Sequence, residues 1–298
     1  MFRSKLLFIL ALSLFSFAYL FAQDEDTTGS DSEWWGHHHR FGFACFNEGF
    51  QGGRPTISFD YGLSNMSLKN FNESFAKPGM LELKLGYTHQ SSNDAAENLL
   101  DYNFKYFYLS NFSTDLSGGS INAGELKTDL WRFGFGRASG YGYKLGGAAI
   151  IPYYSYSVDW SQLKMQDIPL AANDLNTTNL FNESFRFGTS TEGGVRFQII
   201  PHLAVDAGYQ RSIIFPRHLF WKWAGSAVIE AAGQWGIDGF VDEVLDSSPY
   251  AAPVVSFLLK NALSYGIYEL RKDKMNWPFE SASPLMYDQF KFGVTFVF

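Results

Sequence analysis

The segment "FKFGVTFVF", Phe290 to Phe298, alternates between two kinds of side chain. Every second residue from Phe290 onward is apolar, and most of the residues between them are polar or small: Lys291, Gly293 and Thr295. Successive side chains of a β-strand point to opposite faces of the sheet. The segment therefore predicts a strand with one apolar face and one polar face.

The same alternation recurs in seven segments upstream, at 57–63, 81–87, 102–108, 131–135, 141–158, 185–199 and 203–209. Gly146 and Pro152 interrupt the fifth of these segments. A strand that crosses a bilayer needs about 9–11 residues, so the pattern predicts eight strands. Residues 41–50 alternate as well, so this segment is a candidate extra strand and ten strands are the alternative count.

Two architectures fit such alternation, a membrane β-barrel and an extracellular β-sandwich, because both cover one face of every strand with apolar surroundings. One predicted face is strongly aromatic, as at Phe59, Tyr102 and Trp131, while the other is charged, small or rich in glycine. Lipid requires an apolar exterior, and a closed sheet leaves no backbone group unpaired in hydrocarbon. The sequence thus predicts an all-β fold over residues 55–298, a closed antiparallel transmembrane β-barrel, with the sandwich as the alternative.

The connectors between the predicted strands alternate in length. If the first strand begins in the periplasm, the long connectors lie outside the cell and the short ones inside, as is typical of outer-membrane barrels. The long connectors are 64–79, 110–125, 159–182 and 215–285, and the short ones are 91–99, 139–141 and 200–202.

The longest connector is too long for a simple loop. It contains two stretches with helical periodicity, so the sequence predicts an extracellular helical hairpin at about 216–284, inserted before the last strand. Four interpretations of this hairpin are open. Its faces pack on each other and on the barrel rim, or it caps the lumen, lies on the membrane surface, or docks a partner protein.

The N-terminus has the layout of a secretory signal peptide. Arg3 and Lys5 precede an apolar run that ends in small residues, so residues 1–23 are predicted to be a cleaved signal and 24–54 a lead-in segment. Export leaves 21 basic against 30 acidic residues, a net charge near −9, which gives nucleic acid no basic surface to bind. Cys45 is the only cysteine, so no internal disulfide forms.

Two segments resemble a known group of proteins. A terminal Phe298 after alternating aromatics resembles the last strand of bacterial outer-membrane barrels, and "PHLAVDAGYQRS", Pro201 to Ser212, resembles the penultimate strand of the small eight-stranded members. The resemblance implies an integral protein of the bacterial outer membrane that contacts outer-membrane lipid. It also implies recognition of the C-terminal strand, Phe298 above all, by the barrel assembly machinery.

The inward faces of the predicted strands carry charges of both signs. One interpretation is an ion-paired plug, because buried charges must be paired; the alternative is a narrow, cation-lined channel that prefers anions. The predicted lumen residues are Asp60, Glu82, Lys84, Lys105, Arg132, Lys144, Arg186, Glu192, Arg196, Asp206 and Lys291.

One short motif suggests catalysis. His89 and Ser91 lie two residues apart on a predicted strand and so share its outer face. This His-x-Ser arrangement resembles the sites of outer-membrane phospholipases and lipid A deacylases, and the resemblance implies a serine activated by a histidine base. Two features depart from those families. Ser92 precedes the expected Asn, and the nearest acid, Asp101, is predicted to face inward. A polar residue of the interfacial girdle followed by a turn is the alternative.

The other candidate site is a run of three histidines. His37, His38 and His39 hint at metal binding, but adjacent residues of an extended chain point to opposite faces. A lead-in anchored by Trp34 and Trp35 is the alternative. Taken together, the sequence predicts a non-enzymatic surface component that acts by binding or scaffolding and needs no cofactor. The lipid-acyl hydrolase and the anion channel are the rival functions.

Overall fold

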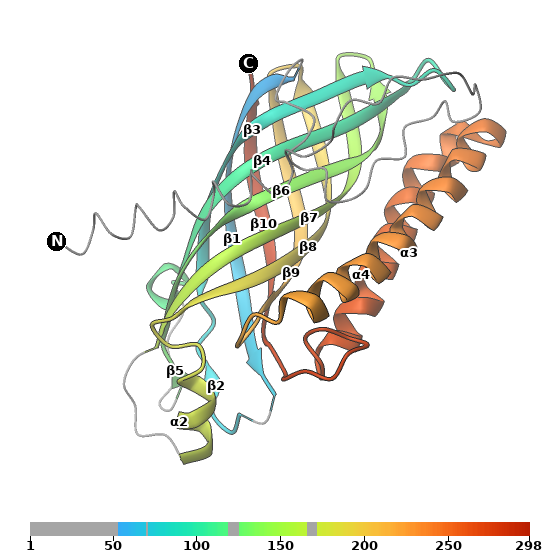
Figure 1. Ribbon diagram of the computed structural model, residues 1–298. Helices are drawn as coiled ribbons and strands as arrows, with labels where there is room; N and C mark the ends of the chain where they lie inside the picture. Colours follow the sequence, from blue (N-terminus) through green and yellow to red (C-terminus); the bar gives the residue numbers. More distant parts are fainter. Residues whose placement is uncertain (1–52, 70, 119–124, 166–171) are drawn as a thin grey trace, which may run out of the picture. The chain divides into compact units, whose positions relative to one another are not determined.

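A computed structural model describes residues 53–69, 71–118, 125–165 and 172–298 (Figure 1). Eight antiparallel strands form a closed barrel in the order β1-β10-β9-β8-β7-β6-β4-β3. The strands are β1 (Arg54–Leu68), β3 (Gly79–Ser92), β4 (Leu99–Ser113), β6 (Thr128–Leu145), β7 (Ala148–Met165), β8 (Phe185–Ile200), β9 (Leu203–Ile214) and β10 (Leu285–Val297). The predicted signal peptide, His37–His39 and the candidate strand at 41–50 lie outside the described residues.

The last strand closes the barrel against the first. The register between β1 and β10 runs without interruption from Thr56 opposite Val297 to Leu68 opposite Leu285. Closure confirms the predicted barrel and excludes two stacked sheets. Phe292 and Trp131, which a sandwich would bury, keep 65% and 53% of their surface exposed.

The wall of the barrel is apolar and the lumen is mainly polar, as lipid outside requires. Large apolar side chains on the outer face are exposed along most strands, among them Phe59, Leu81, Phe107, Trp131, Phe185, Phe197, Phe290, Phe292 and Phe296. The alternate residues are buried inside. The segment from Phe290 to Phe298 therefore has its phenylalanines on the wall and Lys291 and Thr295 in the lumen.

One predicted strand has its faces the other way round. Tyr102, Phe104, Tyr106 and Tyr108 of β4 are buried in the lumen, and Lys105 lies on the outer face, so the prediction that Lys105 lines the lumen is wrong. The tyrosine rings have room and hydrogen-bond partners inside the barrel. Gly136 on the neighbouring strand has no side chain and lies against the ring of Tyr106, whose hydroxyl is hydrogen-bonded to Ser155.

The turn between β6 and β7 also differs from the prediction. The sequence places a short connector at 139–141, but β6 continues to Leu145 and turns at Gly146 and Gly147. Gly146 has a φ of 66°, a conformation that glycine adopts without strain. The pattern of lengths survives this shift. We call the end with 93–98, 146–147 and 201–202 the short-turn end, and the opposite end the long-connector end.

Short elements fill the long-connector end of the barrel. β2 (Ser74–Phe75) and β5 (Glu125–Leu126) form a two-stranded parallel sheet. The 3-10 helix η1 (Thr114–Leu116) precedes β5 in its connector, and helix α2 (Ala172–Thr178) lies in the connector between β7 and β8. Phe75 of β2, Leu126 of β5 and Phe181 after α2 join side chains of the strand ends in one apolar cluster, which contains Met66, Phe75, Met80, Phe112, Leu126, Leu130, Leu163, Met165, Phe181, Ile214, Leu285 and Tyr287.

The predicted hairpin is present, in a place that the sequence did not indicate. It consists of α3 (Phe220–Ser247), the 3-10 helix η2 (Pro249–Ala251) and α4 (Ala252–Arg271). Figure 1 shows both helices running along the side of the barrel, and α4 packs on the outer faces of β6, β7 and β8. The interpretation of the hairpin as a cap over the lumen is therefore wrong. Within the described residues, no helix combines the length and the apolar character needed to cross a membrane.

Candidate functional site

Five strands, β1, β3, β6, β8 and β10, bring charged side chains together around Glu82. Arg132 donates from Nη2 to Glu82 Oε2 at 3.0 Å, and Lys291 donates from Nζ to Oε1 of the same carboxylate at 3.0 Å. Lys291 also lies 2.5 Å from Glu192 Oε2. Lys84 Nζ is 3.4 Å from Asp60, 3.5 Å from Glu82 and 3.9 Å from Glu192. These side chains satisfy one another, as buried charges must.

Arg132 is the most enclosed member of the group, with none of its surface exposed. Its Nη1 donates to the hydroxyl of Tyr287 at 2.6 Å and its Nε donates to Ser110 Oγ at 3.1 Å. The guanidinium carbon lies 5.0 Å from the centre of the Tyr108 ring. A planar guanidinium can make these contacts together because its donors form a fixed fork and its face stacks on aromatic rings.

A second ion pair lies nearer the short-turn end. Arg196 of β8 donates from Nε and Nη2 to the two carboxylate oxygens of Asp206 on β9, at 2.6 and 3.2 Å. Thr295 donates to the same carboxylate and is hydrogen-bonded to Ser58, its register partner on the neighbouring strand β1. We give the name charged layer to eight buried ionic residues of the lumen: Asp60, Glu82, Lys84, Arg132, Glu192, Arg196, Asp206 and Lys291.

The remaining predicted lumen residues lie elsewhere. Lys105 is on the wall, as described above. Lys144 is half-buried at the short-turn end, where its Nζ donates to Ser92 Oγ at 2.6 Å. Arg186 is half-buried near the long-connector end of β8. Lys144 and Arg186 lie outside the charged layer because β6 and β8 extend beyond it, and these two residues stand near the ends of their strands.

Two further layers close the lumen on either side of the charged layer. The apolar cluster of the long-connector end is one of them, the apolar layer. On the other side lies the aromatic layer, composed of Leu100, Tyr102, Phe104, Tyr106, Tyr108, Ala138, Ala149, Ile151 and Tyr153. The layers are joined by hydrogen bonds and stacking. Tyr153 donates to Glu192 at 2.7 Å, and Arg196 lies over the ring of Tyr102.

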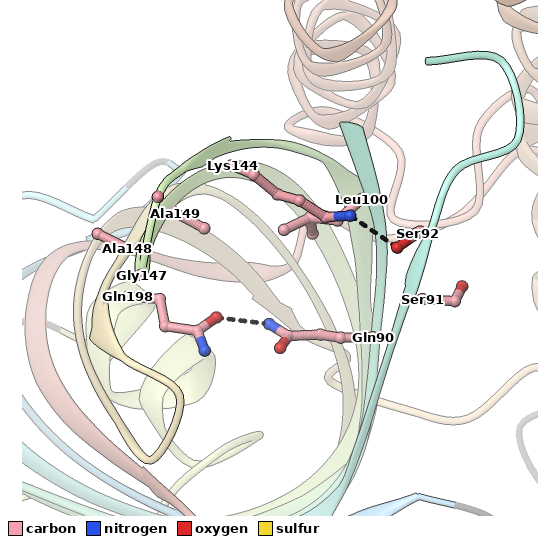
Figure 2. Close-up of a pocket in the computed structure, with 10 residues that line it drawn as sticks. Gln90, Ser91, Ser92, Leu100, Lys144, Gly147, Ala148, Ala149 and Gln198 are labelled. Atoms are coloured by element: carbon pink, nitrogen blue, oxygen red, sulfur yellow. Dashed lines mark hydrogen bonds between the residues drawn. The ribbon is translucent and has the colours of Figure 1, made fainter. Parts of the chain in front are cut away.

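The mouth at the short-turn end holds a cavity of about 230 Å³ beyond the aromatic layer. Figure 2 shows two hydrogen bonds that cross it, from Gln90 to Gln198 at 2.9 Å and from Lys144 to Ser92. The floor of the cavity includes Leu100 and Ala149, both members of the aromatic layer. The cavity is therefore a shallow vestibule, and the aromatic layer separates it from the charged layer.

The predicted His-x-Ser pair faces outward, as expected from its position on β3. His89 and Ser91 line a cavity of about 310 Å³ on the outer wall, which α4 covers with Ser256 and Lys260. Asp101 lines this cavity too, opposite Ser91 in the register of β3 and β4, so the prediction that Asp101 faces the lumen is wrong. The inverted faces of β4 explain this error as they explain Lys105.

The hydrogen bonds of this outer pocket do not form a catalytic chain. Asp101 accepts from Asn93 at 2.7 Å, and Asn103, which lies opposite His89, accepts from Arg137 at 3.2 Å. In the part of the chain that the structure describes, no hydrogen bond joins His89 to Ser91. The residue types of a serine hydrolase are therefore close together, but Asp101 is engaged with Asn93 and no hydrogen bond orients His89 towards Ser91 in the described chain.

Sequence reasoning missed several lumen residues. Asp159 accepts hydrogen bonds from Tyr108 and Ser190, both at 3.0 Å, and Gln289 donates to Gln210. The signal for Asp159 was the row of small polar residues in alternate positions of β7, Ser155, Ser157, Asp159 and Ser161. Pro152, on the opposite face of that strand, obscured the alternation. No group of described residues could hold a metal ion.

The closed ring of eight strands with a polar lumen decides the fold. It is the fold of the small eight-stranded outer-membrane barrels. No family model matches the chain, and no curated protein matches it. Solved structures similar to it include Neisserial surface protein A, with 11% sequence identity and a TM-score of 0.39. The match covers 82% of this chain and 97% of Neisserial surface protein A.

Another similar structure is Ail, the attachment invasion locus protein of Yersinia pestis. It has 9% identity and a TM-score of 0.32, and the match covers 83% of this chain and 99% of Ail. Ail has also been solved in complex with the heparin analogue sucrose octasulfate. Similarity at this level does not transfer a ligand or an activity.

Proposed function

We propose that this protein is an integral component of the bacterial outer membrane that binds or scaffolds at its surface and neither conducts ions nor catalyses a reaction. A single observation carries the proposal: below the vestibule at the short-turn end, the apolar, charged and aromatic layers occupy the lumen with buried side chains. Eight strands leave an interior that side chains can just fill. The surfaces that remain for function are the wall, the hairpin and the connectors.

The same proposal includes export and assembly. The long connectors face the outside of the cell, the signal peptide is cleaved, and the assembly machinery recognises the last strand through Phe298. Support for a recognition role comes from the position of that side chain, which is 65% exposed, while its backbone nitrogen donates to Pro55. The phenyl ring is thus free for contact during assembly.

Conductance in planar bilayers tests the plugged lumen. We expect no current from the full chain and none from a variant in which residues 216–284 are replaced by a short Gly-Ser linker, because the hairpin lies on the wall and does not close the lumen. A general porin inserted under the same conditions is the positive control. Discrete, anion-selective steps from either chain would contradict the proposal and favour the channel.

The lipid-acyl hydrolase is the second candidate, and the observation in its favour is the outer pocket. Ser91 and His89 lie there opposite Asp101 and Asn103, on the outer wall beside α4. Release of fatty acid from phospholipid vesicles tests it. Ser92→Ala is the matched control, since the neighbouring hydroxyl faces the opposite side of the strand and accepts from Lys144. Under the proposed function, no variant hydrolyses lipid. Activity that Ser91→Ala abolishes and Ser92→Ala retains would establish the hydrolase.

A further inference from the structure

The outer faces of the two long helices are apolar over most of their length. α3 exposes Trp221 at 83%, Val228 at 50% and Phe240 at 55%, and α4 exposes Val254 at 48% and Leu258 at 58%. The other exposed residues in the middle of α3 are Ile229, Ala232 and Gly236, and the other exposed residues of α4 are Leu259, Ala262, Tyr265, Gly266 and Leu270, all of them apolar or small. Lys222, in the first turn of α3, is exposed and charged.

The inner face of the hairpin fits a wall that differs from the rest of the barrel. Gly193, in the middle of β8, lies directly under Asn261 in the middle of α4. Nearby outward positions hold Thr189 and Tyr154, both buried although they point away from the lumen. Elsewhere the wall carries exposed aromatic and aliphatic residues. Small and polar residues here indicate that this strip is built to be covered by the helix and not by lipid.

The hairpin extends along the length of the barrel. At the short-turn end, Leu245 and Ala252 pack on Leu99, the first residue of β4. At the long-connector end, Tyr268 packs with Ile213 and Met286. The 20 residues of α4 span roughly 30 Å at 1.5 Å per residue. This is close to the hydrocarbon thickness of a bilayer, about 30 Å.

The exposed apolar surface continues from the barrel onto the hairpin. Phe197 and Val205 on the neighbouring strands β8 and β9 are 41% and 39% exposed, comparable with the outer residues of α4. A helix that lies on the wall at the middle of the strands must share their surroundings. If the wall is in hydrocarbon, the outer face of the hairpin is in hydrocarbon too.

Two ion pairs between the helices make the middle of the hairpin compatible with such a location, and the exposed charges of α3, Lys222, Asp242, Glu243 and Asp246, lie near its two ends. Glu230 of α3 lies 2.8 Å from Arg271 of α4, with both side chains less than 8% exposed. Asp238 lies 2.5 Å from Lys260. Charged side chains at membrane depth persist when they pair or face protein. The average hydropathy of either helix includes these covered residues and therefore understates how apolar the outer face is.

We propose that the α3–α4 hairpin lies within the bilayer, docked on the barrel wall, with its outer face solvated by lipid acyl chains. The inference rests on the membrane insertion of the barrel in the proposed function. In this arrangement the transmembrane part of the protein consists of eight strands and two helices. The wall and the opposite helix cover Glu230 and Arg271, and the surface that meets lipid in the middle of the hairpin is mainly apolar.

Collisional accessibility of spin labels tests the proposal on the full chain. The background is Cys45→Ser, reconstituted in phosphatidylcholine vesicles. Single cysteines replace Leu258 and Phe240 on the hairpin, Phe292 on the barrel wall as the lipid control, and Asp115 of η1 as the water control. Oxygen concentrates in hydrocarbon and a nickel chelate stays in water, so the two relaxation agents together distinguish lipid, water and a protein contact.

We expect the labels at Leu258 and Phe240 to match the label at Phe292, with high oxygen and low nickel accessibility. Nickel accessibility equal to that at Asp115 would place the hairpin in water and overturn the inference. Low accessibility to both agents would mean that protein covers the face, and dipolar broadening between labels would identify a second copy; either result overturns it. Nickel access at Phe292 itself would instead refute the membrane insertion of the barrel.

Discussion

Arg132 shows how single residues hold this lumen together. Its guanidinium joins side chains from four other strands, through Glu82, Ser110, Ser190 and Tyr287. Sequence alternation was sufficient to predict that Arg132 faces inward with Glu82. The partners on other strands could not be read from the sequence, because they depend on the register of strands far apart in the chain.

Replacing Arg132 tests the energetic weight of this centre. Arg132→Met keeps the volume but leaves Glu82 short of one cation and several hydroxyls without their partner. Breaking a buried ion pair costs roughly 3–5 kcal/mol, so we expect the urea midpoint of unfolding in detergent micelles to fall clearly. Lys164→Met, on the exposed outer face of β7, is the control and should leave the midpoint unchanged. Equal midpoints for both variants would show that the charged layer does not stabilise the fold.

The inverted faces of β4 show where residue patterns mislead. Tyrosine is apolar enough to suggest a lipid-facing row, yet its hydroxyl favours a polar lumen. Inside the barrel, Tyr106 is hydrogen-bonded to Ser155 and Tyr108 donates a hydrogen bond to Asp159. Alternation fixes which residues share a face of the strand. It does not say which face points into the lumen when both faces contain residues that suit the lumen. The same ambiguity led to the errors for Lys105 and Asp101.

Among the elements, the hairpin is the least predictable in position. Its existence followed from helical periodicity in a connector too long for a loop, and both helices are present. Its docking depends on residues that no periodicity singles out, Thr189 and Gly193 on the outer face of β8. A glycine in a strand is most simply interpreted as a weak point, whereas here it allows close approach of Asn261.

Gly193→Leu tests this docking. A side chain at this position would meet Asn261, so α4 cannot keep its present distance from β8. We expect faster protease cleavage within residues 216–284 while the barrel keeps its heat-modifiable migration in gels. Val195→Leu is the matched control on the same face of the same strand, where Val195 is 40% exposed. Unchanged cleavage of Gly193→Leu would contradict close packing of α4 on the wall.

At the scale of the whole molecule, the last strand has two separable roles. Its backbone closes the sheet against β1 through Phe298, whose nitrogen donates to Pro55, while the phenyl ring of Phe298 points outward and is exposed. We therefore expect Phe298→Ser to leave the stability of refolded protein unchanged and to lower the amount assembled in cells.

Phe290→Ser is the control for this prediction, because Phe290 has a similar exposure, 61% against 65%, but lies in the middle of β10 and not at the end of the chain. It should assemble more fully than Phe298→Ser when outer-membrane fractions are compared by immunoblot. Equal assembly of both variants would speak against a recognition role for Phe298.

The charged layer also constrains how the chain can reach its final state. Glu82 of β3 and Lys291 of β10 lie on opposite sides of the seam between β1 and β10, so their ion pair forms only when the barrel closes. An open sheet would leave both charges without this partner. Insertion should accordingly be an all-or-none event, in which the final seam and the internal ionic contacts form together and partly closed intermediates do not accumulate.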